Sequence, residues 1–346
     1  MKTSCFFCVF NLIVGEVFII SLNQFSNYIT QCIESKTSDL YILPNETGYR
    51  VMFNSQIQLT TLDQLNKEEG NQLITYLKYR ANMAVSEHRR PQVGAILWEI
   101  KQQKINLRLS SVGDFKGNES LVVRFIYPLA QLKNQQLVPQ QWSQLEQIIS
   151  RRGLVLFSGP MGSGKTTTMY QLAQHCCQSQ IVMTIEDPVE IQEPNFIQLQ
   201  VNDRAQMNYE QLLKVGLRHR PDVFIIGEIR DEVTAKMAVK AALSGHLVMA
   251  TVHAQNTFGV VNRMLQLGVA PEYLEQVIQG ICYQRLLPMT NDQFAVLYDL
   301  LSDAKLELAF DKTNKGMMTS EWEQQLEQCK HENKITKTTA QKYRWG

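Results

Sequence analysis

The stretch GPMGSGKT, at residues 159–166, restricts the fold of this 346-residue chain more than any other feature. It follows an apolar run at 154–158 and precedes a helical pattern from Lys165, which is the context of a phosphate-binding loop. Its three glycines permit backbone conformations in which successive N–H groups point at phosphate oxygens. The sequence therefore predicts a nucleotide-binding loop composed of Gly159, Pro160, Met161, Gly162, Ser163, Gly164, Lys165, Thr166 and Thr167.

The end of this loop predicts the ligand and its metal. Lys165 brings a mobile positive charge to the β- and γ-phosphates of a nucleotide, and the Thr166 hydroxyl is the expected Mg²⁺ ligand. The helix that begins here adds the partial positive charge of its N-terminus. We expect the chain to bind ATP or GTP together with Mg²⁺.

The remainder of the C-terminal region, 140–346, predicts a doubly wound α/β domain with a mainly parallel sheet and a helical tail. Near-continuous apolar runs are typical of buried parallel strands. Such runs occur at 154–158, 181–185, 223–226 and 247–252. Helical patterns occur at 165–177, 209–217, 232–243, 257–267 and 273–281, and a closing helix at 320–331 has Ser320 and Glu323 as its expected capping box.

Residues 23–127 predict a smaller α/β domain. Helices are expected at 24–35 and 62–80, and strands at 39–43, 49–53, 56–60, 94–100, 105–110 and 120–125. The polar segment 128–139 is interpreted as an interdomain linker. The apolar segment 1–22 resembles a signal-peptide core, but an ATP site argues against export. A peripheral membrane anchor, an ordinary packed segment and a start codon placed too early remain open for it.

Charge and cysteine content limit the partners. Net charge is +1, with 34 basic against 33 acidic side chains, so nucleic acid is not expected as a direct partner. The seven cysteines favour a reduced compartment over a disulfide framework. Only Cys5 and Cys8 have metal-ligand spacing and no second pair accompanies them, so we expect no zinc.

Acidic residues follow two of the predicted strands. Glu186 and Asp187 come directly after the strand at 181–185, where open α/β sheets bind ligands, so they are expected to hold Mg²⁺. The strand at 223–226 ends in Gly227, where a magnesium-binding aspartate is usual, and Glu228 follows. Glu228 can polarise the attacking water, and Arg230 can stabilise the negative charge that develops during transfer.

Two histidines flank the strand at 247–252. Strand alternation places His246 and His253 on opposite faces unless the strand bends, so only one is expected to reach the nucleotide. His253, at the C-terminal end, is the predicted hydrogen-bond donor to the γ-phosphate.

Together these motifs resemble the secretion ATPase superfamily of type II secretion, type IV pili and DNA-uptake pseudopili, from about residue 30 to 285. TIEDPVE at 184–190, RPDVFIIGEIRD at 220–231 and SGHLVMATVHAQN at 244–256 are similar to its Asp box, atypical Walker B and His box. Gln284, Arg285 and Leu286 match the end of the family core. The resemblance implies a RecA-like ATPase domain preceded by a PAS-like domain.

The N-terminal unit also matches, through SDLYILP at 38–44 and RRPQVG at 89–94. In this superfamily the strands LRLSSV and ESLVVRF carry arginines toward a neighbouring subunit. The resemblance thus implies that Arg108 and Arg124 are arginine fingers supplied in trans within a homo-hexamer. It makes Lys165, Glu186, Glu228 and His253 the other expected catalytic residues.

Departures from the superfamily pattern select a subgroup. The chain has no extra N-terminal docking domain, no tetracysteine zinc insertion and no retraction-type C-terminal motif. It is most similar to the competence pseudopilus assembly ATPases of Gram-positive bacteria. That similarity implies a cytoplasmic enzyme, peripheral at the membrane, which acts on a platform protein and indirectly on pilins. Pilus retraction, general type II secretion, a non-hydrolysing nucleotide-bound scaffold and a RecA-like DNA translocase are the alternatives.

Overall fold

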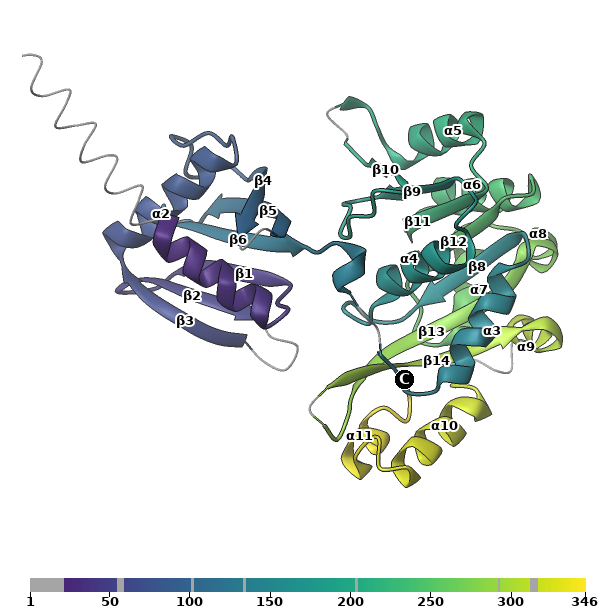
Figure 1. Cartoon of the computed structure of the whole chain (residues 1–346). Coiled ribbons are helices and arrows are strands. Elements are labelled where there is room, and N and C mark those ends of the chain that lie inside the picture. Colours follow the sequence, from purple (N-terminus) through teal and green to yellow (C-terminus); the bar gives the residue numbers. More distant parts are fainter. Residues whose placement is uncertain are drawn as a thin grey trace, which may run out of the picture. The chain divides into compact units, whose positions relative to one another are not determined.

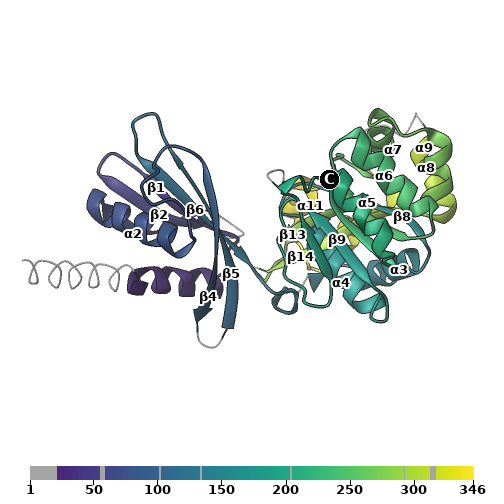
Figure 2. The same ribbon diagram turned by 90° about the horizontal axis from the view of Figure 1, so that it is seen from above.

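The computed structural model describes residues 22–54, 59–100, 103–132, 135–202, 205–291, 293–311 and 317–346. The chain forms two compact units, Met1–Tyr127 and Pro128–Gly346, each with its own sheet (Figures 1 and 2). Apart from its last residue, the apolar segment 1–22 lies outside the described residues. None of the helices in these ranges is both long and apolar enough to cross a membrane.

Unit 1 contains a six-stranded antiparallel sheet in the order β3-β2-β1-β6-β5-β4. Its strands are β1 (Asp39–Pro44), β2 (Gly48–Asn54), β3 (Leu59–Asn66), β4 (Gln92–Ile100), β5 (Gln103–Gly113) and β6 (Glu119–Ile126). Its helices are residues 22–34 and α2 (Lys67–Arg80).

The two helices that the structure describes in unit 1 cover one face of this sheet. Phe25 packs edge-on against Trp98 of β4, with ring centroids 4.9 Å apart, and the Tyr28 hydroxyl donates to Asp63 of β3 at 2.6 Å. Leu107 and Val123 point to the same side and are fully buried. Since side chains alternate along a strand, Arg108 and Arg124 lie on the opposite face.

The start of α2 differs from the prediction. The helix was expected from Leu62, but β3 continues to Asn66, and α2 begins at Lys67. Asn66 and Glu69 form a reciprocal capping box, which fixes the start of the helix there. The pairing of β2 with β3 therefore determines residues 62–66. The strand expected at 56–60 lies mostly outside the described residues.

Unit 2 contains an eight-stranded sheet in the order β10-β9-β11-β12-β8-β13-β14-β7. Neighbouring strands are parallel except β13 and β14, which confirms the expected doubly wound, mainly parallel fold. The strands are β7 (Gln135–Gln136), β8 (Gly153–Ser158), β9 (Val182–Glu186), β10 (Ile197–Gln200), β11 (Val223–Ile229), β12 (Leu247–Val252), β13 (Ile278–Pro288) and β14 (Phe294–Ser302).

Helices cover both faces of this sheet, as in Figure 1, and each face has its own apolar core. One face carries α3 (Pro139–Ile149) and α4 (Lys165–Cys176). The other carries α5 (Tyr209–His219), α6 (Glu232–Leu243), α7 (Thr257–Gln266) and α8 (Pro271–Val277). Strand residues alternate between the two cores, so the parallel strands are apolar throughout.

The expected helix at 273–281 was wrong in its second half. Helix α8 ends at Val277, and β13 starts at Ile278 beside β8 and β14. Short apolar runs fit a helix or a strand, and here the pairing with two neighbouring strands decides.

A helical tail follows β14. It comprises η3 (Asp303–Leu306), α9 (Glu307–Phe310), α10 (Ser320–His331) and α11 (Lys337–Lys342), and α10 packs beside β14 (Figure 1). The N-cap of α10 is Thr319, whose hydroxyl accepts from the Trp322 N–H, so the expected capping box at Ser320 was wrong by one residue.

The segment 128–139, interpreted as a linker, is packed onto unit 2 in its described part. Leu129, in η1 (Leu129–Gln131), belongs to the core beneath α4. β7 pairs with β14, and Leu137 and Val138 are buried against the helical tail. Gln131 and Gln135 are exposed, whereas Leu129, Leu137 and Val138 are buried.

Candidate nucleotide-binding and hydrolysis site

The predicted site residues of unit 2 meet at one edge of the parallel sheet. β9, β11, β12 and β8 are consecutive neighbours, and all run in the same direction. Their carboxyl ends therefore share an edge, where open α/β sheets bind ligands. The phosphate-binding loop follows β8, Glu186 ends β9, Glu228 is the second-to-last residue of β11, and His253 follows β12.

The phosphate-binding loop has the backbone that its glycines predict. Gly159, Gly162 and Gly164 have φ values of 137°, 75° and 84°, in the region that favours glycine. A Cβ added at Gly162 would meet no heavy atom within 4 Å, so this side of the loop is open. Helix α4 begins at Lys165, and its N-terminal N–H groups and partial positive charge are available to an anion.

Lys165 is held at the loop itself. Its Nζ donates to the carbonyl oxygens of Gly159 and Pro160, at 2.9 Å each. Burial lowers the pKa of Lys165, while the nearby Glu228 and Glu190 carboxylates oppose this effect. A positive charge bound only by neutral carbonyls, with acidic groups near it, is suited to exchange those carbonyls for phosphate oxygens.

The loop is also held from the neighbouring strand β13, which the sequence did not show. The Gln284 amide donates to the Ser163 carbonyl at 2.5 Å. A Cβ at Gly159 would lie 2.3 Å from the Gln284 carbonyl oxygen, so only glycine permits this approach. In the sequence Gln284 is visible only as part of a family motif, because spacing along the chain does not reveal a contact between β13 and the phosphate-binding loop.

Glu186 is enclosed at the end of β9. It is 3% exposed, and its Oε1 accepts hydrogen bonds from the Thr184 hydroxyl at 2.8 Å and from the Tyr170 hydroxyl. Burial raises its pKa to about 7, although these two hydroxyls and the Glu190 N–H act in the opposite direction. Tyr170 and Thr184 were not among the predicted site residues.

Gly227 has a packing role at the place of the usual aspartate. A Cβ there would lie 3.1 Å from Glu186 Cγ and 3.2 Å from Glu186 Cα. The register of β11 against β12 shifts between Ile226 and Ile229, and the Thr251 hydroxyl donates to the Gly227 carbonyl. The glycine thus lets the ends of β9 and β11 approach closely and makes room for Glu186.

Glu228 is oriented by groups on both sides. Its Oε2 accepts from Arg230 Nε at 2.5 Å, and its Oε1 lies 2.7 Å from His253 Nε2. Arg230 also lies 3.7 Å from Asp187, so the ends of three strands are joined by charged groups. The Glu228 side chain is 16% exposed, whereas those of Arg230 and His253 are more than half exposed. The Glu228 carboxylate is therefore held in place but remains accessible to solvent.

The two histidines have different surroundings. His246 lies at the other end of β12, where its ring meets Phe224 edge-on and its Nδ1 is 2.8 Å from the Pro221 carbonyl. His253 instead contacts Glu228. The Ser158 hydroxyl donates to the Ala254 carbonyl at 2.8 Å and accepts from its N–H at 3.0 Å, which ties the His253 segment to the start of the phosphate-binding loop. His253 therefore lies at the edge that bears the phosphate-binding loop and His246 at the opposite edge, and a contact of His253 with the γ-phosphate stays a prediction.

Arg108 and Arg124 are cross-strand neighbours in unit 1. They are directly opposite one another on β5 and β6, on the sheet face opposite to Leu107 and Val123. Arg124 Nε donates to Asp39 Oδ1 at 2.8 Å, and Asp39 is opposite Arg124 on β1. The structure therefore brings the two predicted arginine fingers together. Their approach to a nucleotide stays a prediction.

The predicted Mg²⁺ ligands Thr166, Glu186 and Asp187 all belong to this edge. Among the described residues, no three His, Cys, Asp or Glu side chains are close enough to hold a metal by themselves. Mg²⁺ is usually bound by one or two carboxylates together with phosphates and water, and not by a cage of protein ligands. One hydroxyl and two carboxylates beside a phosphate-binding loop fit that chemistry.

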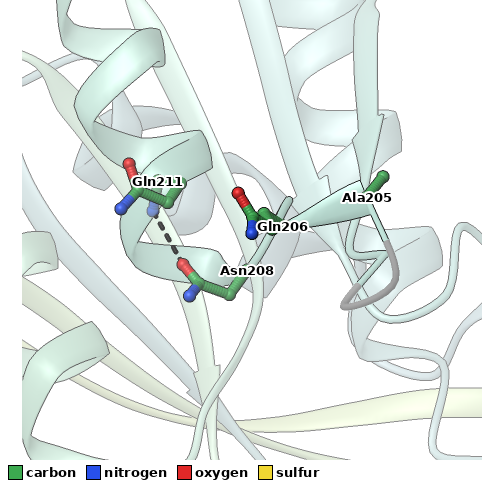
Figure 3. A pocket seen from close by; sticks show the side chains of 4 residues that line it. All are labelled: Ala205, Gln206, Asn208 and Gln211. Atoms are coloured by element: carbon green, nitrogen blue, oxygen red, sulfur yellow. Dashed lines mark hydrogen bonds between the residues drawn. The ribbon is translucent and has the colours of Figure 1, made fainter.

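A hollow lies at the N-terminus of α5 (Figure 3). It has a volume of about 590 Å³ and is lined by Ala205, Gln206, Asn208 and Gln211. The Asn208 side chain accepts from the Gln211 N–H at 2.9 Å and so caps the helix. None of these four described lining residues carries a charged side chain, and we assign the hollow no chemistry.

The fold and the site define a P-loop nucleotide-binding protein with a RecA-like domain. The chain belongs to the Type II/IV secretion system protein family, which its sequence matches over residues 15–341. The resemblance inferred from the motifs is thereby confirmed.

Relatives in Gram-positive bacteria match most of the chain. It is 42% identical to competence protein ComGA of Streptococcus pneumoniae, over 72% of this chain and 80% of that protein. It is 35% identical to ComGA of Bacillus subtilis, over 76% of this chain and 75% of that protein. Type II secretion system protein HxcR of Pseudomonas aeruginosa is 36% identical, but the match spans only 56% of its length.

Solved structures support the fold. The Legionella pneumophila ATPase DotB superposes with a TM-score of 0.71 at 17% identity, covering 91% of this chain and 93% of DotB. The pilus retraction motor PilT with bound ADP gives a TM-score of 0.66 at 22% identity, covering 92% of this chain and 96% of PilT. At these identities the likeness concerns the fold alone.

Proposed function

We propose that the protein is an ATPase that powers assembly of a competence pseudopilus for DNA uptake. Its family membership and its 42% and 35% identity to two ComGA proteins support this function. The structural observation that carries it is the fixed Glu228 carboxylate, placed between Arg230 and His253 at the edge that bears the phosphate-binding loop.

In the proposed reaction, the loop N–H groups and Lys165 bind the phosphates, and Glu228 orients and polarises the attacking water. His253 donates a hydrogen bond to the γ-phosphate, and Arg230 fixes Glu228. Thr166, Glu186 and Asp187 would hold Mg²⁺, which neutralises phosphate charge when bound. Hydrolysis then moves unit 1 relative to unit 2.

The working assembly in this proposal is a homo-hexamer. Arg108 and Arg124 act in trans, each subunit supplying positive charge to the nucleotide of its neighbour. The hexamer is cytoplasmic and peripheral at the membrane, where it works on a platform protein and through it on pilin-like subunits. DNA is cargo of the machine and not a ligand of this chain, in keeping with the balanced charge.

The first test is hydrolysis by the purified full chain with Mg²⁺ and ATP. Lys165→Ala is expected to lose nucleotide binding and at least about 100-fold of the activity, because the loop loses its charged phosphate ligand. Lys236→Ala is the matched control, since Lys236 is a half-exposed lysine paired with Glu232 on α6. Equal activity of wild type and Lys165→Ala would remove the phosphate-binding loop from the reaction.

The second test is cellular. Bacteria that carry Lys165→Ala as their only copy are expected to make no pseudopilus and to lose transformation, whereas Lys236→Ala cells transform normally. Normal transformation of the Lys165→Ala strain, with the variant protein present, would contradict the competence function.

The third test concerns the arginine fingers. Hexamers mixed from Arg124→Ala and Lys165→Ala subunits are expected to regain part of the activity, because some interfaces then combine an intact loop with an intact arginine. Absence of recovery at every mixing ratio would count against action in trans.

A further inference from the structure

Tyr170 contacts the site but has no part in the chemistry above. It lies on α4 and is fully buried, and its ring packs against Phe196 with centroids 5.3 Å apart. Its hydroxyl donates to Oε1 of Glu186. A buried hydroxyl placed on one oxygen of a carboxylate restricts the rotation of that group, because breaking the bond leaves both partners unsatisfied.

The direction of the hydrogen bonds around Tyr170 is fixed by Gln198 of β10. Gln198 Oε1 accepts from the Glu193 N–H at 2.9 Å, so the other end of this amide is the NH₂ group. That group donates to the Tyr170 oxygen at 2.8 Å and to the Ile191 carbonyl at 2.7 Å. With its oxygen occupied as an acceptor, Tyr170 directs its hydrogen to Glu186.

The same network reaches the first residues of unit 2. The Leu129 N–H donates to the Gln192 carbonyl at 3.1 Å, next to the Ile191 carbonyl that Gln198 holds. Gln171, which follows Tyr170 on α4, donates to the Leu132 carbonyl at 2.7 Å. The segment that continues the chain from unit 1 is therefore tied twice to the elements that hold Glu186.

We propose that Tyr170 and Gln198 are positioning residues that fix the Glu186 carboxylate and connect it to residues 128–132. A nucleotide bound beside Glu186 alters the hydrogen bonds of Tyr170 and Gln198. This change is transmitted to residues 128–132, where unit 2 begins. The inference rests on the proposed ATPase function for its kinetic consequence, but its structural consequence requires only nucleotide binding.

The experiment compares Tyr170→Phe, Gln198→Met and a control, Tyr298→Phe. Tyr298 is also fully buried against α4, but its hydroxyl lies 3.4 Å from Thr168 and contacts no site carboxylate. Thermal unfolding with and without ATP establishes folding and binding. Steady-state kinetics give kcat and KM, and hydrogen–deuterium exchange of residues 128–132 reports the connection.

We expect Tyr170→Phe to lower kcat about tenfold while KM changes little, since the lost bond orients the Glu186 carboxylate on the metal side and not the nucleotide. Binding of ATP should slow amide exchange at 128–132 in wild type and in Tyr298→Phe, and not in Tyr170→Phe or Gln198→Met. Gln198 is half-buried on an outer strand, so its variant keeps the test valid if Tyr170→Phe does not fold.

Two results would overturn the inference. One is a kcat for Tyr170→Phe equal to that of Tyr298→Phe. The other is an undiminished ATP-dependent change in exchange in both Tyr170→Phe and Gln198→Met. If the wild-type chain hydrolyses no ATP, the proposed function fails, and the exchange measurement still decides the connection by itself.

Discussion

Glu186 and Glu228 end neighbouring strands of one sheet, yet their surroundings are opposite. Glu186 is 3% exposed and held by two neutral hydroxyls, and its pKa is raised to about 7 by burial. Glu228 is partly exposed and held by a guanidinium and an imidazole. Two carboxylates in different environments can take different roles in one reaction. We infer that Glu228 contacts the attacking water. Glu186, which is held in place by hydrogen bonds, lies on the side where Mg²⁺ would bind.

The largest expected effect concerns stability and pH. The pKa of Glu186 lies near 7 in the folded chain against 4.5 ordinarily, so the folded state binds this proton more tightly than the unfolded state. The stability that this tighter proton binding at Glu186 contributes is therefore fully present below about pH 4.5 and is lost as the pH rises through 7. The loss corresponds to about 3 kcal/mol in the free energy of unfolding.

The measurement is chemical unfolding of nucleotide-free protein at pH 5 and pH 8. Glu186→Gln cannot titrate, so its loss of stability between these pH values should be smaller than that of wild type by up to about 3 kcal/mol. The same pH dependence in both proteins would show that Glu186 is not the enclosed carboxyl described here.

A smaller effect is expected on the Glu228 side. Arg230→Gln removes one of the two groups that orient Glu228 and should lower kcat about tenfold without loss of ATP binding. Lys214→Gln removes a half-exposed ion pair with Glu210 on α5 and serves as the control. Activity of Arg230→Gln equal to that of Lys214→Gln would show that Arg230 does not position Glu228.

The smallest effect concerns the glycine between the two acids. Gly227→Ala should cost about 1 kcal/mol in the free energy of unfolding, because the new methyl presses on Glu186 at 3.1 Å. In a Glu186→Ala background, where Cγ is absent but Cα still lies 3.2 Å away, only part of that cost should vanish. A cost independent of Glu186 would place the constraint elsewhere on β11.

Much of this arrangement follows from local sequence. The phosphate-binding loop, the bounds of α6 and β12, and the positions of Glu186, Glu228 and His253 at strand ends depend on spacing and on apolar runs. The contacts that make the surroundings of Glu186 different from those of Glu228 depend on strand order. Tyr170 meets Glu186 because α4 packs over β11 and β12, beside β9, and Gly227 meets Glu186 because β11 is next to β9.

Strand pairing also explains why parts of two predicted helices are strands. Residues 62–66 and 278–281 are apolar or mixed runs that suit either structure, and pairing with β2 in one case and with β8 in the other decides for strand. Polar composition suggested a free linker at 128–139, but a few apolar residues, among them Leu129 and Leu137, are enough to dock it. The sequence of a segment does not show whether an element far away in the chain will bury it.

The central claim is that Glu228 activates water, and the nucleotide retained by Glu228→Gln tests it most directly. The variant is incubated with labelled ATP and Mg²⁺, separated from free nucleotide, and the bound nucleotide is identified. We predict that Glu228→Gln binds ATP as tightly as wild type and retains it intact, while wild type retains ADP. Recovery of ADP from Glu228→Gln, formed at the wild-type rate, would contradict the claim.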